Sequence, residues 1–302
     1  MNSPRTFDVI AIGGVAWDYI GIVNNYPGPG EKAEISFLDQ QGGGQAGTAI
    51  VTAARLGGTC AITGITGDDE TGEKIKQSLV AEGVDVSRLF IDTGATSHIA
   101  FCFTHNGERT IFYNRGNKRL LSEKDIDGDF IKNCSCLLTD VHHSRASLEA
   151  VRIARKENIP VVTDIERYAP ENDEIFSFAT HNILPVKYLL SFTGEKTLQK
   201  AVTLWQKKFP SSVLVVTLGE EGSLACDGSK VIRQKAYSVS PVVDTTGAGD
   251  VFHGAFARGI TLGYSLEKNL EFASLVAGLK CKMPGGRKGI PGTGQLKGLW
   301  NI

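Results

Sequence analysis

The sequence carries no excess of charge of either sign, since its 302 residues include 32 Lys and Arg against 33 Asp and Glu, for a net charge of −1. This balance argues against a chain that coats nucleic acid or an anionic membrane. No run of about 18 apolar residues occurs, so no membrane-spanning helix is expected. The N-terminal segment also lacks the apolar run of a secretory signal, and we therefore expect a cytoplasmic protein.

Two further absences limit the chemistry. The phosphate-binding pattern G-x-x-x-x-G-K-[ST] does not occur, which excludes a Walker-type kinase. The six cysteines include one close pair, Cys134 and Cys136, with no second pair or His cluster to complete a zinc site. Because most of them lie in apolar runs, where free cysteine packs as a small hydrophobic residue, we expect all six to be reduced.

What the chain does have is an alternation of strand-length apolar runs with segments of helical period. The predicted strands are Asp8–Ile12, Cys60–Ile65, Cys136–Thr139, Pro160–Asp164, Asn182–Leu184 and Val213–Leu218. The predicted helices are Ala46–Leu56, Thr71–Glu82, Ser144–Glu157, Leu198–Phe209, Ala248–Gly263 and Leu266–Lys282. This rhythm predicts an α/β fold with a central, mostly parallel sheet covered by helices on both faces.

Two stretches, about 15–41 and 96–115, are rich in strand formers but contain no helical segment. The second has Asn106-Gly107, a strong signal for a hairpin turn. They predict a small separate β-sheet that acts as a lid and keeps water from a reactive phosphate, although an edge hairpin of the main sheet is the alternative. With no repeat or linker visible, we expect residues 1–302 to form a single domain that includes this lid.

The most informative segment runs from Asp244 to Asp250, with the sequence DTTGAGD, and leads directly into an apolar helix. Gly247, Ala248 and Gly249 open that helix with N–H groups that no large side chain covers, which favours anion binding. Asp250 adds a carboxylate in the first turn. An anion site beside a carboxylate can transfer a phosphoryl group to a hydroxyl, although an acidic residue also suits any helix N-terminus.

Residues 244–257, DTTGAGDVFHGAFA, resemble the C-terminal signature of the PfkB (ribokinase-like) family of sugar kinases. The resemblance implies that Asp250 is the catalytic base and that Gly247, Ala248 and Gly249 form the anion hole. It also implies ATP and Mg²⁺ as cofactors. A monovalent cation such as K⁺ would be held by the carbonyl oxygens of Asp244 and Thr246.

An earlier glycine cluster, Gly42 to Gly47, satisfies G-x-G-x-x-G and keeps an NAD-dependent oxidoreductase open as an alternative. The segment GGQAGTAIVTAARLGG nevertheless resembles the N-terminal signature of the same kinase family. By this resemblance Gly43 and Gly44 contact sugar hydroxyls, and Thr48 stands where the family has Asn. A threonine hydroxyl lacks the two amide donors of Asn.

Other candidate sugar ligands lie near strand ends. Asp18 follows the first strand, and a carboxylate there can accept two hydroxyl protons. Arg167 follows Asp164 at the end of another strand, where it would neutralise a phosphate or pair structurally with Asp164. Lys32, His142 and Arg167 are the basic side chains expected near an anionic sugar, although the adjacent His142 and His143 suggest a solvated loop.

The nucleotide is expected at Thr217, Gly219 and Gly222, which end a core strand in a glycine-rich turn, and at the small residues Ala273 and Ala277, which core packing also explains. The Asn-x-x-Glu element that the family ties to magnesium is absent from 185–188, PVKY. Magnesium would then be held by nucleotide phosphates and water.

The sequence thus predicts an ATP-dependent kinase that phosphorylates a primary hydroxyl of a sugar, with an NAD-dependent oxidoreductase and a non-catalytic sugar-binding protein as alternatives. Thr48, DVFHGA and the segment 279–291 most resemble the branch of the family that contains 6-deoxy-6-sulfofructose kinase. The substrate is therefore expected to be a sulfonated or fructose-like ketose, or a ribose-like sugar. The β-rich lid is a candidate homodimer surface.

Overall fold

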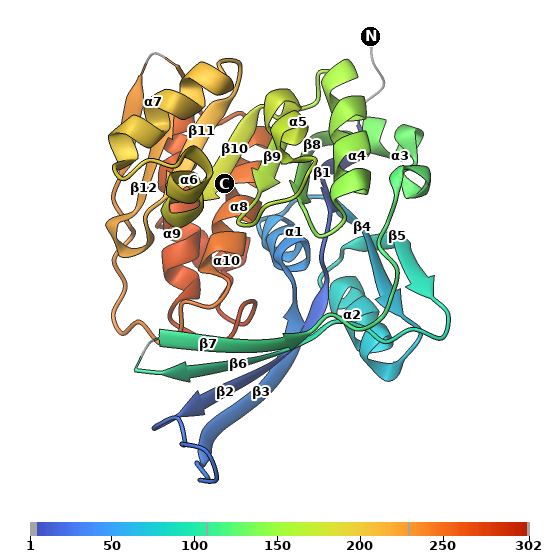
Figure 1. The fold of residues 1–302 in the computed structure, drawn as a ribbon, viewed down its shortest axis with the longest axis vertical. Coiled ribbons are helices and arrows are strands. Elements are labelled where there is room, and N and C mark those ends of the chain that lie inside the picture. The colour runs from blue at the N-terminus through green and yellow to red at the C-terminus, as the bar shows by residue number, and fades with distance from the viewer. Residues whose placement is uncertain (1–4, 107, 229, 301–302) are drawn as a thin grey trace.

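The computed structural model describes residues 5–106, 108–228 and 230–300, and its centre is a nine-stranded sheet (Figure 1). In spatial order the strands are β13 (Val231–Gln234), β12 (Ser223–Cys226), β11 (Val213–Thr217), β10 (His181–Pro185), β9 (Val161–Asp164), β8 (Cys134–Asp140), β1 (Phe7–Ile12), β4 (Cys60–Gly67) and β5 (Asp85–Asp92). Of these nine strands, only β12 runs against the direction of the others, so the predicted, mostly parallel sheet is confirmed.

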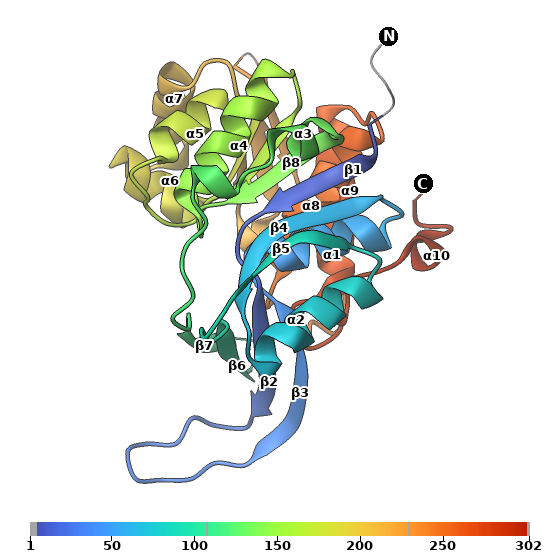
Figure 2. The same ribbon diagram turned by 90° about the vertical axis from the view of Figure 1, so that its right-hand side faces the viewer.

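Helices cover both faces of this sheet, as Figure 2 shows. One face carries α1 (Gln45–Arg55), α2 (Glu70–Ala81), α8 (Ala248–Thr261), α9 (Leu266–Lys280) and the short α10 (Thr293–Leu296). The other carries α3 (Gly128–Lys132), α4 (Ser144–Lys156), α5 (Asn172–Phe178), α6 (Val186–Thr193) and α7 (Leu198–Lys208). Each strand serves both layers, because Val9 and Ala11 pack on the first face while Ile10 and Ile12 pack on the second.

A separate four-stranded sheet extends beneath these layers in Figure 1. Its order is β3 (Ile35–Gly43), β2 (Ala16–Val23), β6 (Ile99–His105) and β7 (Glu108–Asn114). The predicted turn between β6 and β7 falls on Asn106, which has a positive φ of 49°, and on Gly107, which lies outside the described residues. The two strand-rich stretches of the sequence therefore form a second sheet rather than an edge hairpin of the first.

The position of α8 depends on a close helix contact. A Cβ at Gly254 would lie 2.1 Å from the carbonyl oxygen of Ala49 in α1, so the two helices approach at a distance that only glycine permits. This contact fixes the middle of α8 against the middle of α1. Among the helices that the structure describes, none is long and apolar enough to cross a membrane.

Candidate active site

The site lies where the order of the parallel strands reverses. β1 is flanked by β4 on one side and by β8 on the other, and ligands of open α/β sheets bind beyond the strand ends at such a point. Asp140 ends β8 and is fully buried. Its Oδ2 accepts the N–H groups of Gly14 (2.7 Å) and Ala46 (3.3 Å), and its Oδ1 accepts that of His142 (2.7 Å). This carboxylate thus joins β1, the start of α1 and the loop after β8.

The electrostatics of Asp140 fit this anchoring role. Burial alone would raise its pKa, but the nearby His142 and the backbone hydrogen bonds outweigh burial and lower the pKa to about 2. Asp140 is therefore ionised in the folded protein at neutral pH. Its role is to hold the backbone of the site in place and not to accept a proton from the substrate.

Asp250 lies in the first turn of α8, three residues after Gly247, whose φ of +74° turns the chain into the helix. In the described part of the chain, the N–H groups of Gly247, Gly249 and Asp250 meet no protein acceptor. A Cβ at Gly249 would touch nothing within 4 Å, so no other part of the protein covers the side-chain position of this residue. Three free N–H groups at a helix N-terminus, beside a carboxylate, are typical of an anion site.

The prediction that Ala248 contributes a free N–H group to the anion hole is wrong. The N–H of Ala248 donates to the carbonyl oxygen of Thr245 at 3.1 Å, because the chain makes a tight turn before α8 begins. The free amide that takes its place is that of Asp250 itself. The small side chain of Ala248 still leaves the site uncovered.

Burial raises the pKa of Asp250 well above its usual value, and the neighbouring carboxyl groups of Asp164 and Glu166 raise it further. His253, one turn along α8, lies behind it, with Nδ1 2.6 Å from the carbonyl oxygen of Gly249 and Nε2 3.5 Å from Oδ1 of Asp164. Gln45 donates to the same Oδ1 at 3.3 Å. A carboxylate with a raised pKa is a stronger base than a free one, which suits proton removal from a hydroxyl.

The small sheet reaches this site from the other side. Arg109 on β7 donates from Nη1 to the carbonyl oxygen of Thr245 at 3.1 Å, so the sheet contacts the loop that precedes α8. Asp18 on β2 is 8 % exposed and lies over Gly43, where a Cβ would come within 2.1 Å of its carboxylate. Burial raises the pKa of Asp18 to about 6, against the opposing effect of Arg287.

Arg287 and the start of α1 complete the floor under Asp18. Nη2 of Arg287 donates to the carbonyl oxygen of Gly43 at 2.9 Å. Gly44 precedes α1 with a φ of +83°, and a Cβ there would collide with the carbonyl oxygen of Gly14. Thr48 is buried one turn into α1. The residues predicted to contact sugar hydroxyls therefore lie together, beside the Asp140 anchor.

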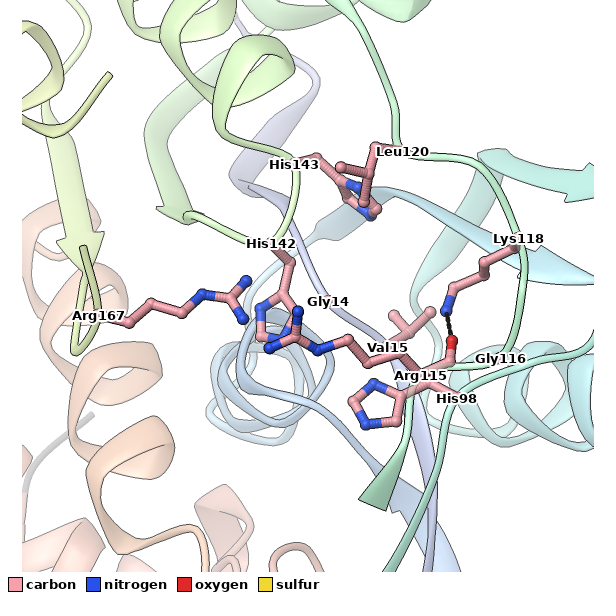
Figure 3. Close-up of a pocket in the computed structure, with 10 residues that line it drawn as sticks. All are labelled: Gly14, Val15, His98, Arg115, Gly116, Lys118, Leu120, His142, His143 and Arg167. Carbon is pink, nitrogen blue, oxygen red and sulfur yellow. Dashed lines mark hydrogen bonds between the residues drawn. The ribbon is translucent and has the colours of Figure 1, made fainter. Parts of the chain in front are cut away.

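A cavity of about 190 Å³ opens next to Gly14 (Figure 3). It is lined by Gly14, Val15, His98, Arg115, Gly116, Lys118, Leu120, His142, His143 and Arg167. Figure 3 shows the guanidinium groups of Arg115 and Arg167 pointing toward the ring of His142. Within the described residues, Arg115, Lys118 and Arg167 form no ion pair with a carboxylate.

The positive groups of this cavity influence one another. Burial lowers the pKa of His98 to about 4, and the charges of Lys118, His142, Arg115 and Arg167 lower it further. Burial likewise lowers the pKa of Arg167, with Arg115 as the next cause. Unpaired cations gathered at a cavity favour an anionic ligand, which would relieve their mutual repulsion.

Of the basic residues expected near the sugar, Arg167 and His142 line this cavity, whereas Lys32 does not. Lys32 is exposed in the loop between β2 and β3. The expectation of a solvated His pair is also wrong for His143, which is 4 % exposed. Arg167 does not pair with Asp164 but donates to the carbonyl oxygen of Val141 at 3.2 Å. Arg115 and Lys118 were not predicted, although Arg115 ends the strand-rich stretch 96–115 and Lys118 follows three residues later.

The predicted nucleotide residues lie at the end of β11, in the turn after it and on α9. Thr217 ends this strand, and Gly219 and Gly222 turn the chain into β12 with φ values of +63° and +97°. Ala273 is fully buried in the core formed with α8, so it packs against protein rather than adenine. Ala277, one turn later, is partly exposed.

Two expectations about cofactors do not fit the structure. Gly42 and Gly43 are the last residues of β3, which belongs to the small sheet and pairs antiparallel with β2, so these glycines do not lie in the parallel β-α-β unit of a dinucleotide site. The carbonyl oxygen of Asp244, expected to bind a monovalent cation, instead accepts Nζ of Lys280 at 2.9 Å. The amide and hydroxyl of Thr246 donate to Oδ1 of Asp244, whereas the predicted cation contact of the Thr246 carbonyl oxygen stays a prediction.

Comparison with known proteins agrees with this geometry. Residues 6–292 match the model of the pfkB family carbohydrate kinases. The chain is 27% identical to ribokinase of Bacillus subtilis over 296 residues, which cover 97% of this chain and 99% of that one. It is 25% identical to mouse ketohexokinase over 292 residues, which cover 92% of this chain and 97% of that one.

A solved structure of Arabidopsis thaliana ribokinase, complexed with ribose and ATP, superposes with a TM-score of 0.84 at 21% identity. The alignment covers 99% of this chain and 100% of that one, and it shows that the two share the ribokinase-like fold. The match to the family extends over nearly the whole chain and includes both glycine-rich segments that build the site. The chain is therefore a carbohydrate kinase and belongs to the PfkB family.

Proposed function

We propose that this kinase transfers the γ-phosphoryl group of ATP to a primary hydroxyl of a sugar that carries an anionic group, such as a sulfonate, away from that hydroxyl. The observation that carries the proposal is the cavity with the unpaired cations Arg115, Lys118 and Arg167. Gly14 lines this cavity and binds Asp140, which also holds the start of α1 beneath the sugar residues. An anion at the cavity would place the body of a sugar toward Asp18 and Asp250.

In this mechanism the carboxylate of Asp250 accepts the proton of the attacking hydroxyl. The free N–H groups of Gly247 and Gly249, at the positive end of α8, stabilise negative charge on the phosphoryl group during transfer. Asp18 accepts hydrogen bonds from two sugar hydroxyls, and the Gly43–Gly44 backbone lets the ring approach closely. The small sheet acts as the lid that excludes water, with Arg109 joining it to the loop before α8.

The nucleotide belongs, in this proposal, beside Thr217, Gly219 and Gly222, with Ala277 as a further contact. ATP binding is supported by the likeness to a ribokinase complexed with ribose and ATP. In the described residues, no group of three or more His, Cys, Asp or Glu side chains is arranged to hold a metal. Mg²⁺ would accordingly arrive on the phosphates, where it neutralises their charge and keeps most of its water ligands.

Matched sugars test the proposed substrate class. ADP release is measured with fructose, ribose, fructose 6-phosphate and 6-deoxy-6-sulfofructose. We expect the anionic ketoses to have a kcat/KM about 100-fold above that of fructose, because a charged hydrogen bond contributes about 1.5–3 kcal/mol. Arg167→Gln should remove about 10- to 100-fold of that preference, with little effect on neutral sugars.

Arg145→Gln serves as the control, since Arg145 is an exposed arginine outside the cavity. Equal rates for neutral and anionic sugars would contradict the proposed substrate class but leave the kinase assignment intact. Absence of ADP release with every sugar would favour the non-catalytic alternative.

The outer face of the small sheet supports a homodimer. Tyr19 stacks on Phe101 with ring centroids 4.9 Å apart, and Phe101 pairs with Phe112 across β6 and β7. Phe112 is 60 % exposed and Leu38 is 62 % exposed, so the sheet has an exposed apolar face of the kind that binds a partner protein. We expect a dimer in sedimentation velocity, and a monomer for Phe101→Ser with Phe112→Ser. A wild-type monomer at micromolar concentration would refute this surface.

A further inference from the structure

A buried lysine lies beneath the loop that forms the anion hole. Lys280 ends α9, its side chain has no exposed surface, and Nζ donates to the carbonyl oxygen of Asp244 at 2.9 Å. Lysine is almost never fully buried without a partner or a role, because removing an ammonium group from water is costly. The proposed transfer step does not use this side chain directly.

The surrounding contacts hold the loop around this ammonium group. The carboxylate of Asp244 accepts the N–H of Thr246 (2.9 Å) and that of Gly285 (2.7 Å). The N–H of Val243 donates to the carbonyl oxygen of Cys281 at 2.8 Å, which ties the residue before Asp244 to the residue after α9. The loop is thus fastened to the segment that follows α9, at Cys281 and at Gly285, beside the Lys280 contact.

The segment after α9 also packs against Gly247, a residue of the predicted anion hole. Gly247 adopts a φ of +74°, and a Cβ there would lie 2.8 Å from Cα of Gly286, in the segment after α9. The conformation that exposes the N–H of Gly247 therefore depends on how the segment after α9 packs against the loop. The Lys280 ammonium lies at that junction.

The charges of Lys280 and Asp244 influence each other's pKa, although Nζ of Lys280 contacts the carbonyl oxygen of Asp244 and not its carboxylate. Burial lowers the pKa of Lys280, and the negative charge of Asp244 opposes this effect. Burial opposes ionisation of Asp244 as well, but hydrogen bonds from Thr246 and Gly285, together with the charge of Lys280, lower its pKa overall. The two groups stabilise each other's charged forms.

These observations do not fit a free monovalent cation on the carbonyl oxygen of Asp244. That oxygen already accepts a hydrogen bond from a cationic donor, and a second cation at the same oxygen would be repelled by Nζ. We infer that the ammonium group of Lys280 is a built-in cation that positions the anion-hole loop, so that the kinase needs no K⁺. Lys280 is a positioning residue, since it acts through Asp244 and Gly247 rather than on the substrate.

The inference depends on kinase activity but not on the choice of sugar. Turnover and melting temperature are measured in KCl, NaCl and choline chloride at equal ionic strength. For the wild type we expect turnover to agree within about 2-fold, and melting temperature within about 1 °C, in all three salts, because no free cation site is left. A kcat that K⁺ raises tenfold or more over choline would overturn the inference.

Truncation of the Lys280 side chain is the second test of the inference. Lys280→Ala should lower kcat about 100-fold in choline chloride, with KM for the sugar nearly unchanged, because the anion hole loses its shape. K⁺ or NH₄⁺ should enter the space left behind, restore part of kcat and raise the melting temperature of this variant. Lys282→Ala, an exposed lysine two residues on, is the matched control and should behave as the wild type.

Full kcat of Lys280→Ala in choline would also overturn the inference. If this variant fails to fold, the salt comparison on the wild type still decides the question. The melting arm needs no substrate, so its result is independent of whether the anionic sugar is the right one.

Discussion

Asp250→Asn is expected to lower kcat by on the order of 10³-fold or more, since the amide cannot accept the hydroxyl proton that the carboxylate takes. The side chain keeps its shape, and the helix start that carries Gly247 and Gly249 is unchanged. KM for ATP should therefore change little. Steady-state ADP release measures the loss.

Folding is the control for this variant. Burial raises the pKa of Asp250 above its unfolded value, so the ionised carboxylate destabilises the folded state at neutral pH. Replacing it by a neutral amide should leave the melting temperature unchanged or raise it. A near-wild-type kcat would reject Asp250 as the base, whereas a large fall in melting temperature would show that the variant reports on folding instead.

Asp140→Ala is expected to have the largest effect on stability. The substitution leaves the buried N–H groups of Gly14, Ala46 and His142 without their acceptor, which should lower the free energy of unfolding by about 3–5 kcal/mol. For a chain of this size that corresponds to a fall of about 10 °C in melting temperature. The wall of the cation-lined cavity would loosen at the same time, so KM for the sugar should rise.

The pH dependence provides the check. The pKa of Asp140 is lowered from 3.8 to about 2. The contribution of its charge to the free energy of unfolding is therefore complete above pH 4 and is lost as the pH falls toward 2. That shift corresponds to about 2 kcal/mol at neutral pH. The difference in stability between wild type and Asp140→Ala should thus narrow below pH 4. A difference that does not depend on pH would contradict the charged anchor.

The sequence predicted the layered fold because burial patterns are local. Core strands such as Val213–Thr217 are continuous apolar runs, and helices such as Ser144–Lys156 bury the side chains of one face. Both patterns can be recognised within a short segment of sequence. β5 and the β12–β13 hairpin were missed. β5, DVSRLFID, is half-buried at the edge of the sheet, and the outer strands β12 and β13 have only four residues each, too few to set a period.

The site was only partly predictable for a different reason. Asp250 and the glycines beside it lie in one segment, whose resemblance to a family gives each residue a role. The cation-lined cavity joins Arg115 after β7 to Arg167 after β9, and no local pattern brings those two together. Lys280 was missed because a lysine near a helix end is usually a solvated C-terminal residue, and only its burial shows otherwise.

The most direct test of the account is a crystal structure of the enzyme with ADP, aluminium fluoride and the sugar that it turns over fastest. We predict that the fluoride group accepts hydrogen bonds from the N–H groups of Gly247 and Gly249, with the acceptor hydroxyl within hydrogen-bonding distance of the Asp250 carboxylate. A fluoride group bound elsewhere, or a hydroxyl that meets a different base, would contradict it.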